Sequence, residues 1–378
     1  DVVFLDGGEL LVIGDGRPVR ITQNGTRIED ANRGIQASRI LSVAVSPNGD
    51  VYAVGASPIS VTSTYPTDPA GSFRQVNGVT TDFSPVSSPL GYVGVSFIDP
   101  DISFFSYQDG RLRLSSNKGQ TYTSFYAAPL ASAWSSEQIQ SSSTASNSDR
   151  PEKYGPISPP FALVEKFDPL VLTADGKRQG TSYLFIATSQ GLWTLTNPIS
   201  TNPDTIAHWN LVSNTPIGLN ASHTYADYVN PSRSIPTALA ADTAYTVWIG
   251  TSNGQLLRIK NAHDVTINRT SQDGVENLTS QISALVDGRY ISAIAVHPSN
   301  PALVAIAVGS YAGPADRIFL STNATSSAPT FTSVQGNLPD VPVYSLFFHP
   351  DSSALLLAGT EWGLWRCPNV TASAPAWE

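Results

Sequence analysis

The sequence predicts an all-β protein in which one sheet-forming unit is repeated along the chain. Short apolar runs rich in Val, Ile, Phe and Tyr are bounded by Gly, Pro, Asn and Asp, and no segment has the period of a long amphipathic helix. A turn rich in Gly, Thr, Ser and Asn, followed by an alternating apolar strand that ends on Asn, occurs three times. The copies are ATSQGLWTLTN (187–197), GTSNGQLLRIKN (250–261) and AGTEWGLWRCPN (358–369). A hairpin sequence that recurs several times along the chain favours a closed repeat architecture.

A longer form of the unit starts one strand earlier. It reads apolar run, Pro-containing turn, second apolar run and Gly. The clearest copies are RYISAIAVHPSNPALVAIAVGSY (289–311) and PVYSLFFHPDSSALLLAGTEW (342–362), and earlier versions are ILSVAVSPNGDVYAVGAS (40–57) and GYVGVSFIDPDISFFSYQDG (91–110). Proline lacks the N–H that a sheet needs, so it ends each strand where the chain reverses.

The repeat predicts a single domain, 1–378, folded as a seven-bladed β-propeller with long polar inter-strand loops, because each unit carries the three or four short strands of a blade. The predicted blades are 1–36, 37–80, 90–128, 160–213, 234–286, 289–336 and 340–378. The longest insertion, the Ser-rich loop 132–160, contains too little apolar sequence to fold by itself. Insertions of this length are often functional.

Composition restricts the partners and the location of the protein. The formal net charge is −9 and there is no basic run, which argues against nucleic acid as a partner. No run of about 18 apolar residues occurs, so no transmembrane segment is predicted. The sequence contains no Met and starts directly in a strand-like run, which suggests a mature chain that has lost a targeting segment. We therefore expect a secreted, extracellular protein.

Six Asn-x-Ser/Thr sequons make a glycoprotein a hypothesis that a glycosidase-induced mass shift would test. They are Asn24, Asn220, Asn268, Asn277, Asn323 and Asn369. The single cysteine, Cys367, lies in a strand-like segment, which favours a buried thiol over pairing with another chain.

The segment SSNKGQTY (115–122) resembles the Asp-box, or BNR, motif Ser-x-Asp-x-Gly-x-Thr-Trp. The matching positions are Ser115, Asn117, Gly119, Thr121 and Tyr122, with Asn in place of Asp and Tyr in place of Trp. LSTN (320–323) followed by FTSV (331–334) looks like a decayed second copy. The chain therefore resembles the sialidase-like superfamily of extracellular propellers, which includes sortilin-type receptor domains and xyloglucan-active glycosidases. In that superfamily the box is a structural turn between the third and fourth strands of a blade.

Catalytic residues of that superfamily are not recognisable. A sialidase resemblance would require an early Phe-Arg-Ile-Pro segment, which is missing, and a xyloglucanase resemblance would require two Asp facing a cleft. The Asp residues at predicted strand ends are better explained as turn residues; they are Asp99, Asp101, Asp168 and Asp242. No Gly-rich loop leads into a helix, so no nucleotide cofactor is predicted.

Two His-Pro pairs and two Gly-Leu-Trp triplets are better explained as equivalent positions of the repeat than as metal-binding or contact residues. His297 and His349 precede equivalent prolines, so we expect them to be structural and predict no metal site. Trp193 and Trp365 are likewise expected to be core residues.

The predicted function is a non-catalytic module that binds a protein or carbohydrate partner, including further copies of itself in an extracellular assembly or filament. Tyr225 and Tyr228 lie in a polar insertion outside the repeat and are the predicted contact loop. Two alternatives stay open: a glycoside hydrolase or lyase acting on polysaccharide, and a fragment of a receptor ectodomain.

Overall fold

The computed structural model describes fourteen stretches of the chain. They are residues 2–5, 9–13, 18–22, 27–30, 39–56, 73–82, 90–107, 111–126, 159–174, 177–188, 191–198, 209–213, 234–266 and 274–378. Seven small antiparallel sheets are formed by these residues, six with four strands and one with three. In the order of the sequence each strand pairs with the one that follows it within its sheet. The Ser-rich loop lies outside the described residues except for its last two.

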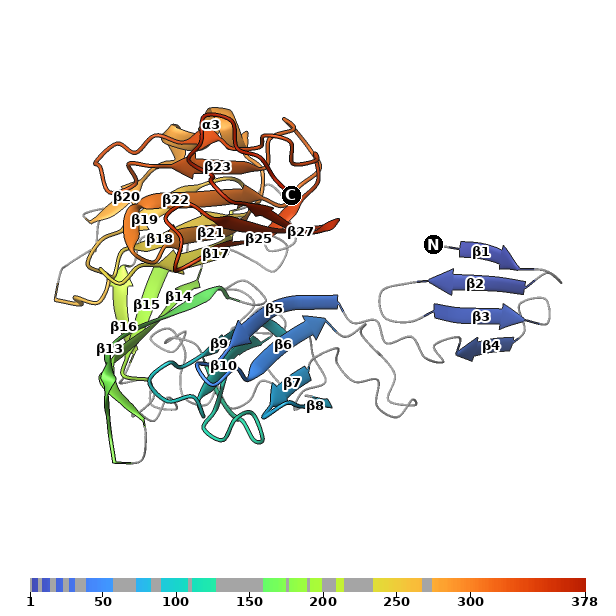
Figure 1. Cartoon of the computed structure of the whole chain (residues 1–378), viewed down its shortest axis with the longest axis horizontal. Helices are drawn as coiled ribbons and strands as arrows, with labels where there is room; N and C mark the ends of the chain where they lie inside the picture. Colours follow the sequence, from blue (N-terminus) through green and yellow to red (C-terminus); the bar gives the residue numbers. More distant parts are fainter. Residues whose placement is uncertain are drawn as a thin grey trace, which may run out of the picture. The chain divides into compact units, whose positions relative to one another are not determined.

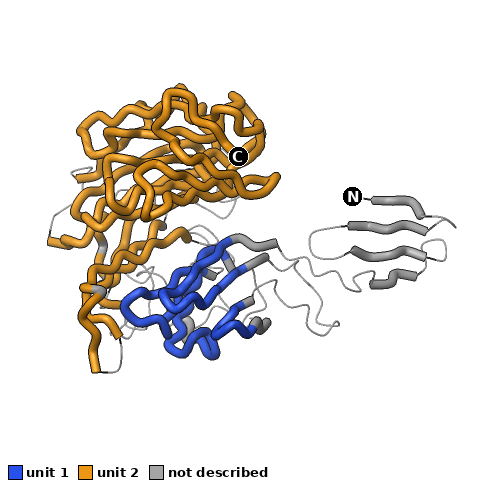
Figure 2. Tube along the Cα trace, in the orientation of Figure 1, with its two compact units in different colours: residues 1–108, 113–123 blue, residues 109–112, 124–378 orange. Residues whose placement is uncertain are grey.

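The chain divides into two compact units (Figure 2), of which unit 1 comprises residues 1–108 and 113–123. The first two sheets belong to it. Their strands are β1 (Val2–Leu5), β2 (Glu9–Ile13), β3 (Pro18–Thr22), β4 (Arg27–Asp30), β5 (Arg39–Val45), β6 (Val51–Ala56), β7 (Phe73–Val76) and β8 (Val79–Asp82). The third sheet contains β9 (Leu90–Val95), β10 (Ser103–Tyr107), β11 (Arg111–Ser115) and β12 (Thr123–Tyr126), and the unit boundary passes through its last two strands.

Unit 2 holds the other four sheets and one helix (Figure 1). Two sheets consist of β13 (Phe161–Leu172), β14 (Arg178–Thr188), β15 (Gly191–Thr196) and β16 (Trp209–Ser213), and of β17 (Pro236–Ala241), β18 (Val247–Thr251), β19 (Leu256–Ile259) and β20 (Val275–Asn277). The last two consist of β21 (Ile291–His297), β22 (Asn300–Val308), β23 (Ile318–Ser321) and β24 (Thr332–Ser333), and of β25 (Val343–Phe348), β26 (Leu356–Thr360) and β27 (Gly363–Cys367). The three repeated hairpins are the second and third strands of their sheets.

The helix α3 (Thr279–Val286) corrects the all-β prediction: the protein is mostly β. Ile282 and Val286, one turn apart, are its buried residues, so eight residues are enough to bury one stripe. Asn277, the last residue of β20, accepts the N–H of Thr279, the first helical residue, through Oδ1 at 3.0 Å. At the other end Asp287 adopts a left-handed conformation, which breaks the helical backbone. The segment is too short to show a helical period in the sequence.

One side-chain acceptor closes the first turn of five sheets. It stands at or just after the end of the first strand, and it accepts the backbone N–H two residues further on. The acceptors are Ser46, Ser96, Asp242, His297 and His349, at donor–acceptor distances of 3.3, 3.1, 2.8, 3.3 and 3.2 Å. Serine, aspartate and histidine therefore have the same structural role at this position, which is to accept a backbone N–H of the turn.

First strands of successive sheets lie against one another, β5 on β9 in unit 1 and β13, β17, β21 and β25 in series in unit 2. Side-chain hydroxyls link them: Thr237 donates to the carbonyl of Ile291 at 2.7 Å, and Ser292 donates to that of Val343. Both hydroxyl residues stand at a β-bulge of the first strand. The register of the ladder shifts at each bulge, and the hydroxyl at that position reaches the neighbouring sheet. The Thr237 hydroxyl also lies 3.3 Å from the carbonyl of Gly250 within its own sheet.

The Gly that ends the second strand of the repeat allows this close approach. A Cβ at Gly250 would lie 2.5 Å from Cγ2 of Ile291, on the first strand of the next sheet. Contacts this short are not tolerated, so only glycine fits. In unit 2 the apolar faces of neighbouring sheets are buried against each other, and the core there consists of successive clusters between sheets.

The C-terminal residues are anchored by Trp377, which is 3% exposed. Its indole N–H donates to the carbonyl of Val334 at 2.9 Å, and its backbone N–H donates to Asn337. Glu378 exchanges two backbone hydrogen bonds with Arg366 on the free edge of β27. The last residues thereby join the three-stranded sheet to the sheet before it.

We expect Trp377→Ala to lower the free energy of unfolding by about 3–5 kcal/mol, because it removes a large buried side chain and leaves a cavity. Trp362→Ala is the matched control, since Trp362 is 68% exposed and its loss should change stability by less than about 0.5 kcal/mol. Denaturant unfolding followed by circular dichroism measures both. Equal effects of the two substitutions would contradict the assigned anchor.

Candidate functional site

The Asp-box-like segment forms the turn between β11 and β12, the third and fourth strands of their sheet. Asn117 accepts the N–H of Thr121 through Oδ1 at 2.9 Å and the hydroxyl of Ser115 at the same distance. The Ser115 hydroxyl oxygen in turn accepts the N–H of Gly119 at 2.8 Å, and Gly119 has a φ of 75°. Tyr122 packs edge-on against Phe105, and burial raises its pKa. These contacts stabilise a turn, and they leave few polar groups of the segment for binding or catalysis.

The segment after β23 repeats this geometry. Ser321 donates its hydroxyl to Oδ1 of Asn323 at 3.1 Å, and the same oxygen accepts the N–H of Thr330 at 2.8 Å. The residues between Asn323 and Thr330 are more numerous than in the first turn, which explains why only LSTN was recognisable in the sequence. The amide holds the loop in both places.

Three of the six sequons are described by the structure. Asn277 and Asn369 are exposed, and each accepts the N–H two residues further on through Oδ1. Asn323 is half-buried within the turn described above. Asn24, Asn220 and Asn268 lie outside the described residues, as do Tyr225 and Tyr228 of the predicted contact loop. Glycosylation and a role for the two tyrosines stay predictions.

The carboxylates considered for catalysis bond to their own turns. Asp99 accepts the N–H of Asp101, and Asp168 accepts that of Leu170, in addition to the turn that Asp242 closes. In the part of the chain that the structure describes, no group of three or more His, Cys, Asp or Glu side chains is placed to hold a metal ion. In the same part, no helix is long and apolar enough to cross a bilayer. Cys367 is a fully buried thiol whose pKa is raised by burial.

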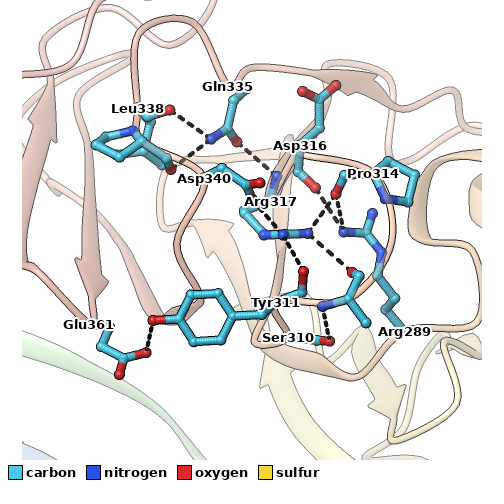
Figure 3. Close-up of polar contacts among 12 residues, drawn as sticks. Arg289, Ser310, Tyr311, Pro314, Asp316, Arg317, Gln335, Leu338, Asp340 and Glu361 are labelled. Carbon is cyan, nitrogen blue, oxygen red and sulfur yellow. Dashed lines mark hydrogen bonds and ion pairs between the residues drawn. The ribbon is translucent and has the colours of Figure 1, made fainter.

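A polar site that the sequence did not reveal lies in unit 2, around the loop between β22 and β23 (Figure 3). Two buried arginines hold this loop from inside. Arg289 donates to the carbonyls of Pro314 and Asp316 at 2.7 and 3.2 Å. Arg317, which has no exposed surface, donates to the carbonyls of Pro314 and Tyr311 at 2.6 and 3.1 Å. Both guanidinium groups therefore converge on one carbonyl and fix the loop conformation.

The charges of the two arginines are compensated unequally. Arg317 forms an ion pair with Asp340, a half-exposed carboxylate. Burial, and next the charge of Arg317, lower the pKa of Arg289. The nearby carboxylates of Asp287, Asp316 and Asp340 act in the opposite direction. Two cations are thus held close together because carbonyl oxygens and acidic side chains surround them.

The loop presents Tyr311 to a carboxylate on the last hairpin. Tyr311 donates its hydroxyl to Oε2 of Glu361 at 2.7 Å, and Tyr344 on β25 donates to the same oxygen at 3.3 Å. Trp362 follows Glu361 in the turn between β26 and β27. Tyr311, Tyr344 and Trp362 are 60%, 51% and 68% exposed. We call these four residues the Glu361 surface; three large rings open to solvent around one carboxylate are typical of a contact site.

A signal for this surface was present in the repeated hairpin. At the turn where the other two copies read Ser189-Gln190 and Ser252-Asn253, the last copy reads Glu361-Trp362. The last copy thus has a charged and an aromatic residue where the other two copies have small or amide residues. It is the only one of the three copies whose turn sequence contains a large ring.

The fold is shared with solved β-propellers. The structure of the GH74 enzyme of Niastella koreensis has a TM-score of 0.52 and 15% identity, and the match covers 100% of this chain and 53% of that one. The GH74 xyloglucanase of Xanthomonas campestris has a TM-score of 0.53 and 15% identity, with 98% and 52% covered. The β-propeller domain of Cps50 (Swd1) from Myceliophteria thermophila has a TM-score of 0.50 and 12% identity, with 96% and 94% covered. The protein has a β-propeller fold.

The similarity is confined to structure. No known protein family and no curated protein matches the sequence. The chain spans about half the length of the two GH74 structures. At these identities the comparison shows the fold and nothing about activity.

The Tyr311–Glu361 hydrogen bond predicts a specific titration. The bond to the carboxylate favours the protonated phenol, so it raises the pKa of Tyr311. We expect Glu361→Gln to lower that pKa toward the ordinary value of about 10. Carbon-13 NMR of labelled tyrosine rings over a pH series measures it, and Glu378→Gln is the control that removes one exposed negative charge elsewhere. An unchanged Tyr311 titration in Glu361→Gln would show that the bond is not formed in solution.

Proposed function

We propose that the protein is a secreted, non-catalytic β-propeller that binds a protein or glycan partner through the Glu361 surface. The supporting observation is the exposure of three large rings near Glu361, those of Tyr311, Tyr344 and Trp362. Of these, Tyr311 belongs to the loop that two buried arginines hold in place. Aromatic rings supply much contact area for little conformational entropy, and a fixed loop loses little freedom on binding. A role in an extracellular assembly belongs to the same proposal.

We further propose that the seven sheets are the seven blades of one ring. Support comes from the serial contact of first strands within each unit and from Phe347 and Leu364 of the last sheet, 56% and 72% exposed, which a neighbouring blade would cover. A single compact body of this length has a radius of gyration of about 21 Å. Small-angle X-ray scattering tests this, and a clearly larger value would indicate two separate bodies.

The alternative, a glycoside hydrolase or lyase, requires two carboxylates that face a substrate across a cleft. Three of the four aspartates considered for that role instead accept N–H groups of their own turns. Asp101, the fourth, lies 3.8 Å from the ammonium group of Lys118. These roles favour binding over hydrolysis.

The proposal is tested by screening the protein against glycan and peptide arrays, with Tyr311→Ala and Trp362→Ala beside the unchanged protein. We expect each substitution to weaken binding of the selected ligands at least about fivefold, since central aromatic residues carry most of the energy of an interface. Phe97→Ala is the matched control, because Phe97 is an exposed ring, 45% accessible, in unit 1. Turnover of a polysaccharide that is lost in Glu361→Gln would instead favour the enzyme. Ligand binding that neither Tyr311→Ala nor Trp362→Ala changes would place the contact site elsewhere.

A further inference from the structure

We propose that the Glu361 surface recognises a positively charged group, the side chain of Lys or Arg on a partner protein. This inference rests on the proposed function, since it names the partner chemistry of the same surface. It follows from the hydrogen-bonding capacity of the surface, from the charges around it and from the rings beside Glu361.

The polar atoms of the surface are almost all acceptors. Both tyrosine hydroxyls already donate to Oε2 of Glu361. This leaves the other carboxylate oxygen and the phenolic oxygen of Tyr311 as acceptors, and one donor, the indole N–H of Trp362. A ligand must therefore bring donors. Ammonium and guanidinium groups offer donors only, whereas a sugar hydroxyl also needs a donor in return. The arrangement favours a cation over a neutral saccharide.

The charges around the loop also favour a cation. Glu361 supplies the negative charge of the surface, and its carboxylate raises the pKa of the Tyr311 phenol. The whole chain carries a net charge of −9, so a cationic partner is attracted from a distance as well as at contact.

Aromatic rings beside a carboxylate complete a site for a cation. A cation within about 6 Å of a ring centroid is stabilised by the ring, most strongly by Trp. This protein already uses the interaction in its interior, where Lys166 lies 4.2 Å from the ring centroid of Tyr245 and Arg258 lies 5.3 Å from that of Trp248. At the Glu361 surface Tyr311, Tyr344 and Trp362 are 60%, 51% and 68% exposed, so a cation of a partner can reach their rings.

The test uses three probes in isothermal titration calorimetry with the whole chain: the acetylated peptide Gly-Arg-Gly-Lys-Gly-Arg-Gly, its neutral counterpart with Gln at each basic position, and cellohexaose. We expect the basic peptide to bind and the two neutral probes to bind at least about fivefold more weakly. Glu361→Gln should weaken the basic peptide by about fivefold or more, because it removes the charge but keeps the shape. Trp362→Ala should also weaken it.

Glu378→Gln is the matched control for charge, since Glu378 is an exposed carboxylate that pairs with Arg366 at 3.4 Å. Equal weakening by Glu361→Gln and Glu378→Gln would overturn the inference in favour of unspecific attraction. If a neutral probe binds, its binding is lost in Trp362→Ala and the basic peptide does not bind, the inference is overturned while the proposed function stands. If no probe and no array ligand responds to Trp362→Ala or Tyr311→Ala, both proposals fail. Thermal unfolding shows that each variant is folded.

Discussion

The contact between first strands of neighbouring sheets is the constraint on which the structure depends. It needs three features at once: a β-bulge at Thr237 or Ser292 in the first strand, a hydroxyl on that residue that bonds the next sheet, and a glycine, Gly250, whose missing side chain leaves room for the neighbouring first strand. The sheets of unit 2 bury their apolar faces against one another, so we expect none of these sheets to be stable alone. The repeated units of the sequence contain a Gly and a Ser or Thr because this contact requires them.

The same repetition explains why side chains of types that are common in catalytic and metal sites have structural roles in this protein. A short turn needs an acceptor for its N–H groups, and Ser, Asp and His all provide one. In His297 the accepting atom is Nδ1, so the proton lies on Nε2, which donates to the carbonyl of Ser352 at 2.7 Å. Both ring nitrogens are thus engaged within the fold, and a residue type associated with metal binding has a structural role here.

Much of the fold could be predicted from the sequence, and the candidate site could not. Strand order follows from short apolar runs and their turns, which are local. The helix α3 was missed because eight residues carry only two buried positions, Ile282 and Val286. The site was missed because Tyr311, Tyr344 and Glu361 come from three separate turns and strands, and only folding brings their side chains together. Glu361 and Tyr344 occupy repeat positions, where side chains have structural roles in the other copies.

The two buried arginines connect the fold to the surface. A guanidinium without solvent is costly unless its donors are satisfied, and the loop from 309 to 317 supplies carbonyls from Tyr311 and Pro314 for that purpose. The loop conformation is therefore set by the need of Arg317 for acceptors, independently of any ligand. Since Tyr311 belongs to that loop, its ring is positioned before binding. Stability of the interior and preorganisation of the surface come from the same hydrogen bonds, so mutations beneath the loop should alter recognition without touching the partner.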